Sequence, residues 1–172
     1  MNTSKSLHTK SILEINLISA QQLVSSKKSY RIQTYVVAYL DYDEKSKLLS
    51  RIDELGSRNP TWNDKFIFCV DSALLNATSC IVFEIYKVGR KLFQKDKRIG
   101  VVRVLLEDLI HGGGSNHKFM AFHVRNRSDI PQGILNIGVV TFNGICEQVM
   151  SRLLGSNSGI DYRNFLGGSG GL

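Results

Sequence analysis

The residues best suited to chemistry lie in one segment of the chain, between positions 87 and 98. Six Lys or Arg residues face one Asp there, a net of five positive charges, and Leu92 and Phe93 stand in the middle. A basic segment with an aromatic tip suits an anionic membrane surface, because each cation contributes ~1 kcal/mol and the aromatic ring enters the interface. We expect constitutive, salt-sensitive attachment. The alternatives are a surface for a protein partner and a solvated loop.

Two short motifs are similar to parts of hydrolase active sites. His111-Gly-Gly-Gly114 resembles the oxyanion-hole motif of lipases, and Gly167-Gly-Ser-Gly-Gly171 fits the Gly-x-Ser-x-Gly pattern of a nucleophile elbow. That elbow needs a strand-to-helix turn, with an acid and a His later in the chain. Only three residues follow Ser169, and neither partner is among them. We interpret both matches as accidents of composition, and predict no catalytic residue and no enzyme activity.

Metal and cofactor sites are not indicated either. No histidine pair has the spacing of a zinc site, and no glycine-rich phosphate motif occurs. The cysteines, Cys69, Cys80 and Cys146, are odd in number and lack Cys-x-x-Cys spacing, and the first two lie in apolar runs. This pattern predicts buried, reduced thiols. We therefore expect no metal and no cofactor.

Length and composition describe one globular domain with a tail. The 172 residues are 42% hydrophobic and 22% charged, with a formal net charge of +7. No apolar run approaches the ~18 residues of a membrane span, and the polar first ten residues show no secretory signal. We expect a cytoplasmic protein, peripheral at the cytosolic face of the plasma membrane or of endomembranes. The clustered basic residues lack a recognition helix or an aromatic sheet face, so nucleic acid is not the expected partner.

Alternating apolar residues run through most of the chain. Leu13, Ile15 and Leu17 alternate with polar residues, the period of a strand with one face on a core. Eight strands are predicted, near residues 13–17, 35–40, 45–52, 66–70, 81–85, 99–105, 119–124 and 133–142, with 45–52 as a polar edge. Turns are predicted at 56–60, 111–116 and 126–133, and short helices at 72–76 and 106–111. Short strands without crossover helices predict an all-β, antiparallel sandwich or barrel.

The character of the chain changes after Phe142. Residues 143–172 are rich in Gly, Ser and Asn, although 146–154 could form a short amphipathic helix. The chain is therefore divided into a polar lead at 1–10, a domain at 11–142 and a flexible tail at 143–172. The tail either is disordered or folds on a partner.

Three segments resemble the C2 domain family. Leu13–Leu23 is similar to the first C2 strand, Asn59-Pro-Thr-Trp-Asn-Asp-Lys-Phe-Ile-Phe68 to its Asn-Pro-x-Trp-Asn-Glu-x-Phe-x-Phe segment, and Ile99–Leu109 to a later strand and turn. Pro131–Ile137 further resembles small single-domain C2 proteins of plants, of the soybean cold-regulated type and of the copine-associated defence-regulator type. The resemblance implies an eight-stranded antiparallel C2-type β-sandwich. Within it, Trp62 is expected to anchor the two sheets.

The calcium site implied by the resemblance lacks its acids. Gln33 stands where the family has a ligand Asp, and residues 25–31 contain no acid at all. In the later loop the family's Asp-x-Asp aligns with Lys87-Val-Gly89, which leaves Asp96 as the single carboxylate before Ile99. Since Ca²⁺ takes about six to eight oxygen ligands, several of them anionic, we predict no specific calcium binding.

On the sandwich hypothesis the basic residues of two neighbouring loops gather at one end. The predicted lipid-binding residues are Lys27, Lys28, Arg31, Lys87, Arg90, Lys91, Phe93, Lys95, Lys97 and Arg98. The expected partners are anionic membrane lipids and a protein such as a copine or another membrane-associated signalling protein, bound by a monomer. The resemblance implies a role in plant stress or defence signalling, including cell-death regulation. A module that binds only a protein partner is the alternative.

Overall fold

The chain folds as an antiparallel β-sandwich in a computed structural model that describes residues 10–23, 31–71, 76–89, 94–110, 117–143 and 159–161. One short helix interrupts the strands. The elements are β1 (Lys10–Gln21), β2 (Thr34–Leu40), β3 (Asp43–Leu49), β4 (Thr61–Asp71), β5 (Cys80–Lys87), β6 (Lys97–Leu105), α1 (Leu106–Ile110), β7 (His117–Arg125), β8 (Pro131–Asn143) and β9 (Gly159–Asp161).

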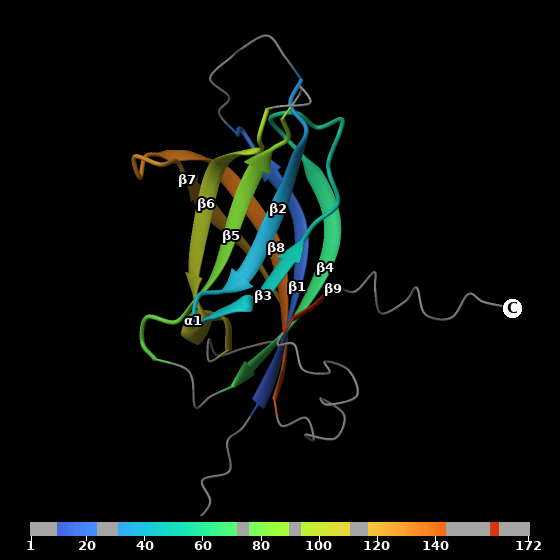
Figure 1. Cartoon of the computed structure of the whole chain (residues 1–172). Helices are drawn as coiled ribbons and strands as arrows, with labels where there is room; N and C mark the ends of the chain where they lie inside the picture. The colour runs from blue at the N-terminus through green and yellow to red at the C-terminus, as the bar shows by residue number, and fades with distance from the viewer. Residues whose placement is uncertain are drawn as a thin grey trace, which may run out of the picture.

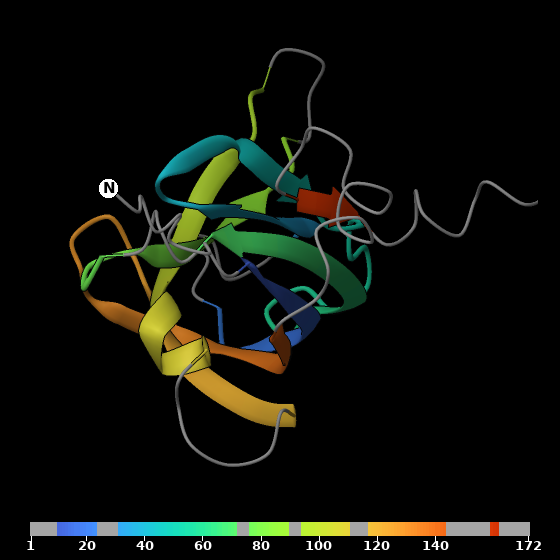
Figure 2. The same ribbon diagram turned by 90° about the horizontal axis from the view of Figure 1, so that it is seen from below.

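The strands are hydrogen-bonded in the order β3-β2-β5-β6-β7-β8-β1-β4-β9. Strands β3, β2, β5 and β6 form one layer, and β7, β8, β1, β4 and β9 form the other (Figures 1 and 2). The layers are joined at a corner where β6 and β7 pair only at Val101 and Arg125. Gly100 permits this corner, since a Cβ added there would lie 2.3 Å from Cγ1 of Val124.

Inward-facing residues of both layers make one hydrophobic core. Phe66 and Phe68 of β4 and Phe83 of β5 are its largest fully buried side chains. Their positions follow the predicted alternation, because successive residues of a strand point to opposite faces. Trp62 is 3% exposed, and its Nε1 donates to the backbone oxygen of Thr34 at 3.1 Å. It therefore links β4 to β2 of the other layer, as predicted.

The structure confirms the predicted fold class and the eight strands. The edge strand ends at Leu49, so Ile52 belongs to the following loop. The short helix α1 is present, whereas most of the helix predicted at 72–76 and the turn at 111–116 lie outside the described residues. Cys80 is buried as predicted, but Cys69 is only partly buried; Cys146 lies outside the described residues.

The strand β9 was not predicted. It comes from the segment interpreted as a flexible tail, and it pairs antiparallel with the middle of β4. Backbone pairing to an existing edge requires no side-chain pattern, so three residues with no alternation form a strand there. The remainder of the tail, including the helix considered at 146–154, lies outside the described residues.

Candidate functional site

The two loops predicted to carry the basic site are adjacent at one end of the sandwich. Thr34 at the start of β2 pairs with Lys87 at the end of β5. One residue beyond each strand, the backbone nitrogen of Val88 donates to the oxygen of Gln33 at 3.0 Å. The loops before β2 and after β5 therefore leave the sheet side by side, at the upper end in Figure 1 and far from α1.

The predicted site residues differ in how far they reach solvent. Arg31, Lys95 and Lys97 are exposed, whereas Lys87 and Arg98 are partly buried. The other five lie outside the described residues: Lys27, Lys28, Arg90, Lys91 and Phe93. Among the described residues of this predicted set, three thus present exposed cations, two on the loops and Lys97 at the start of β6.

Arg98 is bound to a neighbouring strand. Its guanidinium forms an ion pair with Glu84 of β5, and that carboxylate also accepts a bond from the hydroxyl of Tyr86 at 2.8 Å. The hydrogen bond to Glu84 raises the pKa of Arg98. A β-bulge creates the contact: Ile85 pairs with Gly100 but Tyr86 pairs with Arg98, so one residue is extra. The charge of Arg98 is therefore balanced within the sheet.

The one acid of the later loop holds that loop closed. Asp96 accepts hydrogen bonds from the hydroxyl of Tyr35 at 2.9 Å and from the backbone nitrogen of Gly89 at 2.8 Å. Burial, and then the bond to Asp96, raises the pKa of Tyr35 to about 12. The loop base is narrow, since a Cβ on Gly89 would lie 1.7 Å from the backbone oxygen of Gln94. One oxygen of Asp96 thus closes the loop, and the other ties the loop to Tyr35 of β2.

A third loop at the same end was missed by the sequence analysis. The loop between β3 and β4 is joined to β2 by two backbone hydrogen bonds between Thr34 and Asp53, of 3.1 and 2.8 Å. It exposes two apolar side chains, Ile52 at 49% and Leu55 at 75%. The sequence contains a signal for this exposed side chain, because Leu55 is an apolar residue directly before the predicted turn that begins at Gly56. The sequence pattern instead predicts Ile52 as the last residue of the edge strand at 45–52.

The carboxylate of Asp53 in this third loop also closes its own loop. Its oxygens accept from the backbone nitrogens of Gly56 at 2.7 Å and Thr61 at 3.4 Å. Within the part of the chain that the structure describes, no three His, Cys, Asp or Glu residues are grouped to hold a metal ion. The acids near these loops therefore act as acceptors for backbone and tyrosine donors.

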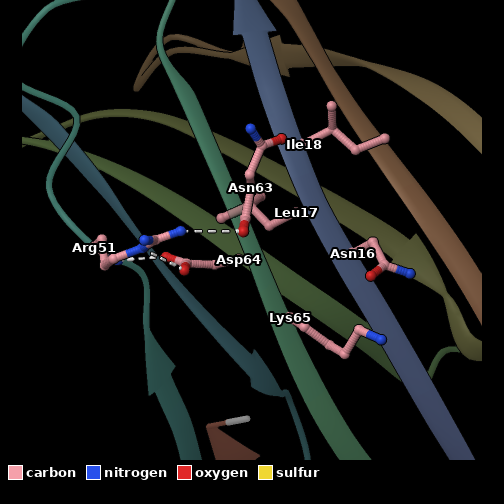
Figure 3. A pocket seen from close by; sticks show the side chains of 7 residues that line it. All are labelled: Asn16, Leu17, Ile18, Arg51, Asn63, Asp64 and Lys65. Atoms are coloured by element: carbon pink, nitrogen blue, oxygen red, sulfur yellow. Dashed lines mark hydrogen bonds and ion pairs between the residues drawn. The ribbon is translucent and has the colours of Figure 1, made fainter. Parts of the chain in front are cut away.

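A cavity of about 370 Å³ lies beside the third loop, where β1 and β4 are irregular (Figure 3). Arg51 lines one side of it and donates to the Asp64 carboxylate at 2.9 Å, and to the backbone oxygens of Trp62 and Asn63 at 3.1 and 3.2 Å. Asp64 is only 4% exposed. This arrangement stabilises the start of β4, because a buried carboxylate needs a charged donor.

The comparison with protein families decides the identity of the fold. The sequence model of the C2 domain family matches residues 11–121 of this chain. The chain belongs to the C2 domain family. Among the described residues of this C2 domain, no helix is long and apolar enough to cross a bilayer, since α1 has five residues.

Two plant proteins are similar in sequence to this C2 chain. BON1-associated protein 2 of Arabidopsis thaliana is 29% identical over 130 residues, which cover 74% of this chain and 60% of that protein. The 16 kDa phloem protein 1 of the same plant is 30% identical over 102 residues, covering 59% and 63%. The matches thus span about three fifths of the length of each relative.

Solved structures share the fold. A C2 domain of plant Extended Synaptotagmin 1 superposes with a TM-score of 0.64 at 18% identity, over 78% of this chain and 96% of that one. A C2 domain-containing protein from a putative elicitor-responsive gene gives 0.56 at 20% identity, over 81% and 93%. At such identities these likenesses concern the fold alone.

Proposed function

We propose that this C2 domain is a calcium-independent, non-enzymatic module that docks on anionic membrane surfaces through the loops at one end. One observation carries the proposal: exposed cations and exposed apolar side chains meet there. Arg31 and Lys95 are exposed on two loops and Lys97 at the start of β6, and Ile52 and Leu55 are exposed on the adjoining third loop. This combination suits the boundary between lipid headgroups and acyl chains.

The magnitudes favour docking without a metal ion. Each exposed cation near an anionic leaflet contributes ~1 kcal/mol, and burying most of Leu55 adds about 1–2 kcal/mol. With three exposed cations, these contributions sum to several kcal/mol before the cost of association. Asp53 already accepts hydrogen bonds from its own loop and from the first residue of β4, and Asp96 accepts one from its own loop and one from Tyr35 of β2. Recruiting them as calcium ligands would compete with those bonds.

The biological role proposed is that of an adaptor in plant stress or defence signalling, including cell-death regulation. Support comes from the relative named for its association with BON1 and from the neighbour named for an elicitor-responsive gene. The proposed partner is accordingly a membrane-associated signalling protein of the copine type. In this arrangement the loops meet the lipid while other surfaces of the sandwich remain available to the protein.

The test is vesicle sedimentation in EDTA, with phosphatidylcholine alone or mixed with about one third phosphatidylserine. We expect binding to the mixed vesicles only, weakened by salt, and weakened at least tenfold by Lys95→Glu with Lys97→Glu. The matched control is Lys45→Glu with Arg103→Glu, which changes the same charge toward the other end of β3 and β6. Leu55→Ala should weaken binding several-fold without changing the charge.

Three outcomes would contradict the proposal. Equal losses for both charge variants would mean that net charge alone matters. No binding by the unaltered chain would leave a module that binds only proteins. Micromolar calcium affinity in a calorimetric titration would overturn calcium independence.

A further inference from the structure

One side of the sandwich is closed by a corner and the other by a separate segment of chain. At the corner, β6 continues into the second layer through β7. On the opposite side β4 has β1 as one neighbour and β9 as the other, and β9 also lies close to β3 (Figure 2). The row of backbone groups along this side of β4 is therefore covered by a strand from the distant C-terminal part of the sequence.

The first part of this β4 edge is obstructed. Arg51 donates to the backbone oxygens of Trp62 and Asn63, so these two acceptors are already engaged. Asn63 also has a left-handed backbone with φ of 47°, so the strand is not regular there. An added strand needs a regular row of donors and acceptors. Pairing on this side is consequently directed to the residues that follow Asp64.

Strand β9 occupies that position with only three residues. It pairs Gly159, Ile160 and Asp161 with Phe68, Ile67 and Phe66. Residues 144–158 separate it from β8. So short a strand is weakly stable by itself, and its main advantage is that the chain tethers it, at an effective concentration on the order of millimolar.

We propose that the β4 edge at Phe66–Phe68 is a docking site for an extended segment of a partner protein, and that Gly159–Asp161 holds the site until the partner replaces it. Recognition would use backbone pairing, as in other cases where a peptide adds a strand to a sheet. Ile160 is the residue in register with Ile67. The partner segment is therefore expected to carry a β-branched apolar residue between small or polar ones. This site is separate from the proposed lipid surface.

The experiment uses the full chain with Gly159→Pro and Ile160→Pro. Neighbouring amides of a strand point to opposite sides, so one of the two prolines removes a donor that faces β4. The probe is a fluorescent peptide with the sequence of residues 155–165. We expect saturable binding to the double-proline chain, and about tenfold weaker binding to the unaltered chain, whose own strand competes. The matched control chain carries Gly167→Pro and Gly168→Pro and should behave like the unaltered chain.

Amide NMR of the double-proline chain should show faster hydrogen exchange at Phe66–Phe68, reversed by the probe peptide. The same peptide with prolines at 159 and 160 should not bind. Equal affinity for both chains, or none for either, overturns the proposal. It is also overturned if the unaltered chain is a dimer that the prolines convert to a monomer, because the strand would then serve a second copy. Vesicle binding should be the same in the double-proline chain and in the unaltered chain. A failure of the proposed membrane docking would therefore be distinguishable from a failure of this proposal.

Discussion

Two groups of charged side chains near the same end of the sandwich are used in opposite ways. The Arg51–Asp64 pair has its acid buried at 4% exposure, with the guanidinium bound to that acid and to two backbone oxygens. Lys95 is exposed on the loop after β5, and Lys97 is exposed at the start of β6. In the first group an exposed guanidinium neutralises a buried carboxylate, whereas the second group presents unneutralised charge to solvent. Cationic residues of one sequence thus divide into those paired within the fold and those left exposed, for which we propose a recognition role.

The substitution Arg51→Ala is expected to have the largest effect on the first of these two groups. It removes the charged donor of a buried carboxylate and the cap on two backbone oxygens, so we expect a loss of about 2–3 kcal/mol in the free energy of unfolding. Vesicle binding by the folded protein should change little. Urea denaturation measures the first quantity and sedimentation the second. The control is Arg103→Ala, an exposed arginine on β6, which should leave both nearly unchanged.

A second change addresses the acid that closes the basic loop. Asp96→Asn weakens the hydrogen bonds to Tyr35 and Gly89, with an expected stability loss of about 1 kcal/mol. It should also lower the pKa of Tyr35 from about 12 toward 10.0, while Tyr42, whose pKa of about 12 arises mainly from burial, should not change. Ultraviolet titration of tyrosinate reads both groups.

The sign of the accompanying pH dependence follows from the direction of the shift. The folded pKa of Tyr35 lies above its unfolded value of 10.0, so the native state holds the proton more tightly. The stabilisation is complete below pH 10 and is lost as the pH rises toward 12. If Asp96→Asn leaves the alkaline titration and this stability profile unchanged, the loop-closing role assigned to Asp96 is wrong.

The smallest expected effect sharpens the comparison, because it changes Arg98 from a paired cation into an unpaired one. Glu84→Gln removes the anionic partner of Arg98 and leaves its cation available beside Lys97. Affinity for anionic vesicles should rise about two- to fivefold. Glu107→Gln changes the same charge on α1 at the other end and is the control. A rise of equal size in both variants would show that the position of Arg98 has no influence.

Much of the fold could be predicted because sorting between core and solvent is a local property of each strand. The alternation of Leu13, Ile15 and Leu17 predicted a buried face, and all three are fully buried. The motif around Trp62 likewise predicted its role between the layers. Of the candidate site, the sequence indicated the basic segment and its neighbouring loop but missed Ile52 and Leu55, since backbone pairing of Thr34 with Asp53 brings that loop to the same end.

By itself, the sequence determined the sandwich, its core and the excess of positive charge between residues 87 and 98. Only the tertiary structure decided which charges are balanced and which strand covers the β4 edge. Arg98 meets Glu84 because a bulge in β6 shifts the register, and β9 pairs its backbone with that of β4. Burial preferences are carried by the side chains of each segment, whereas register and edge pairing depend on segments far apart in the chain. A single sequence records the first and leaves the second to the fold.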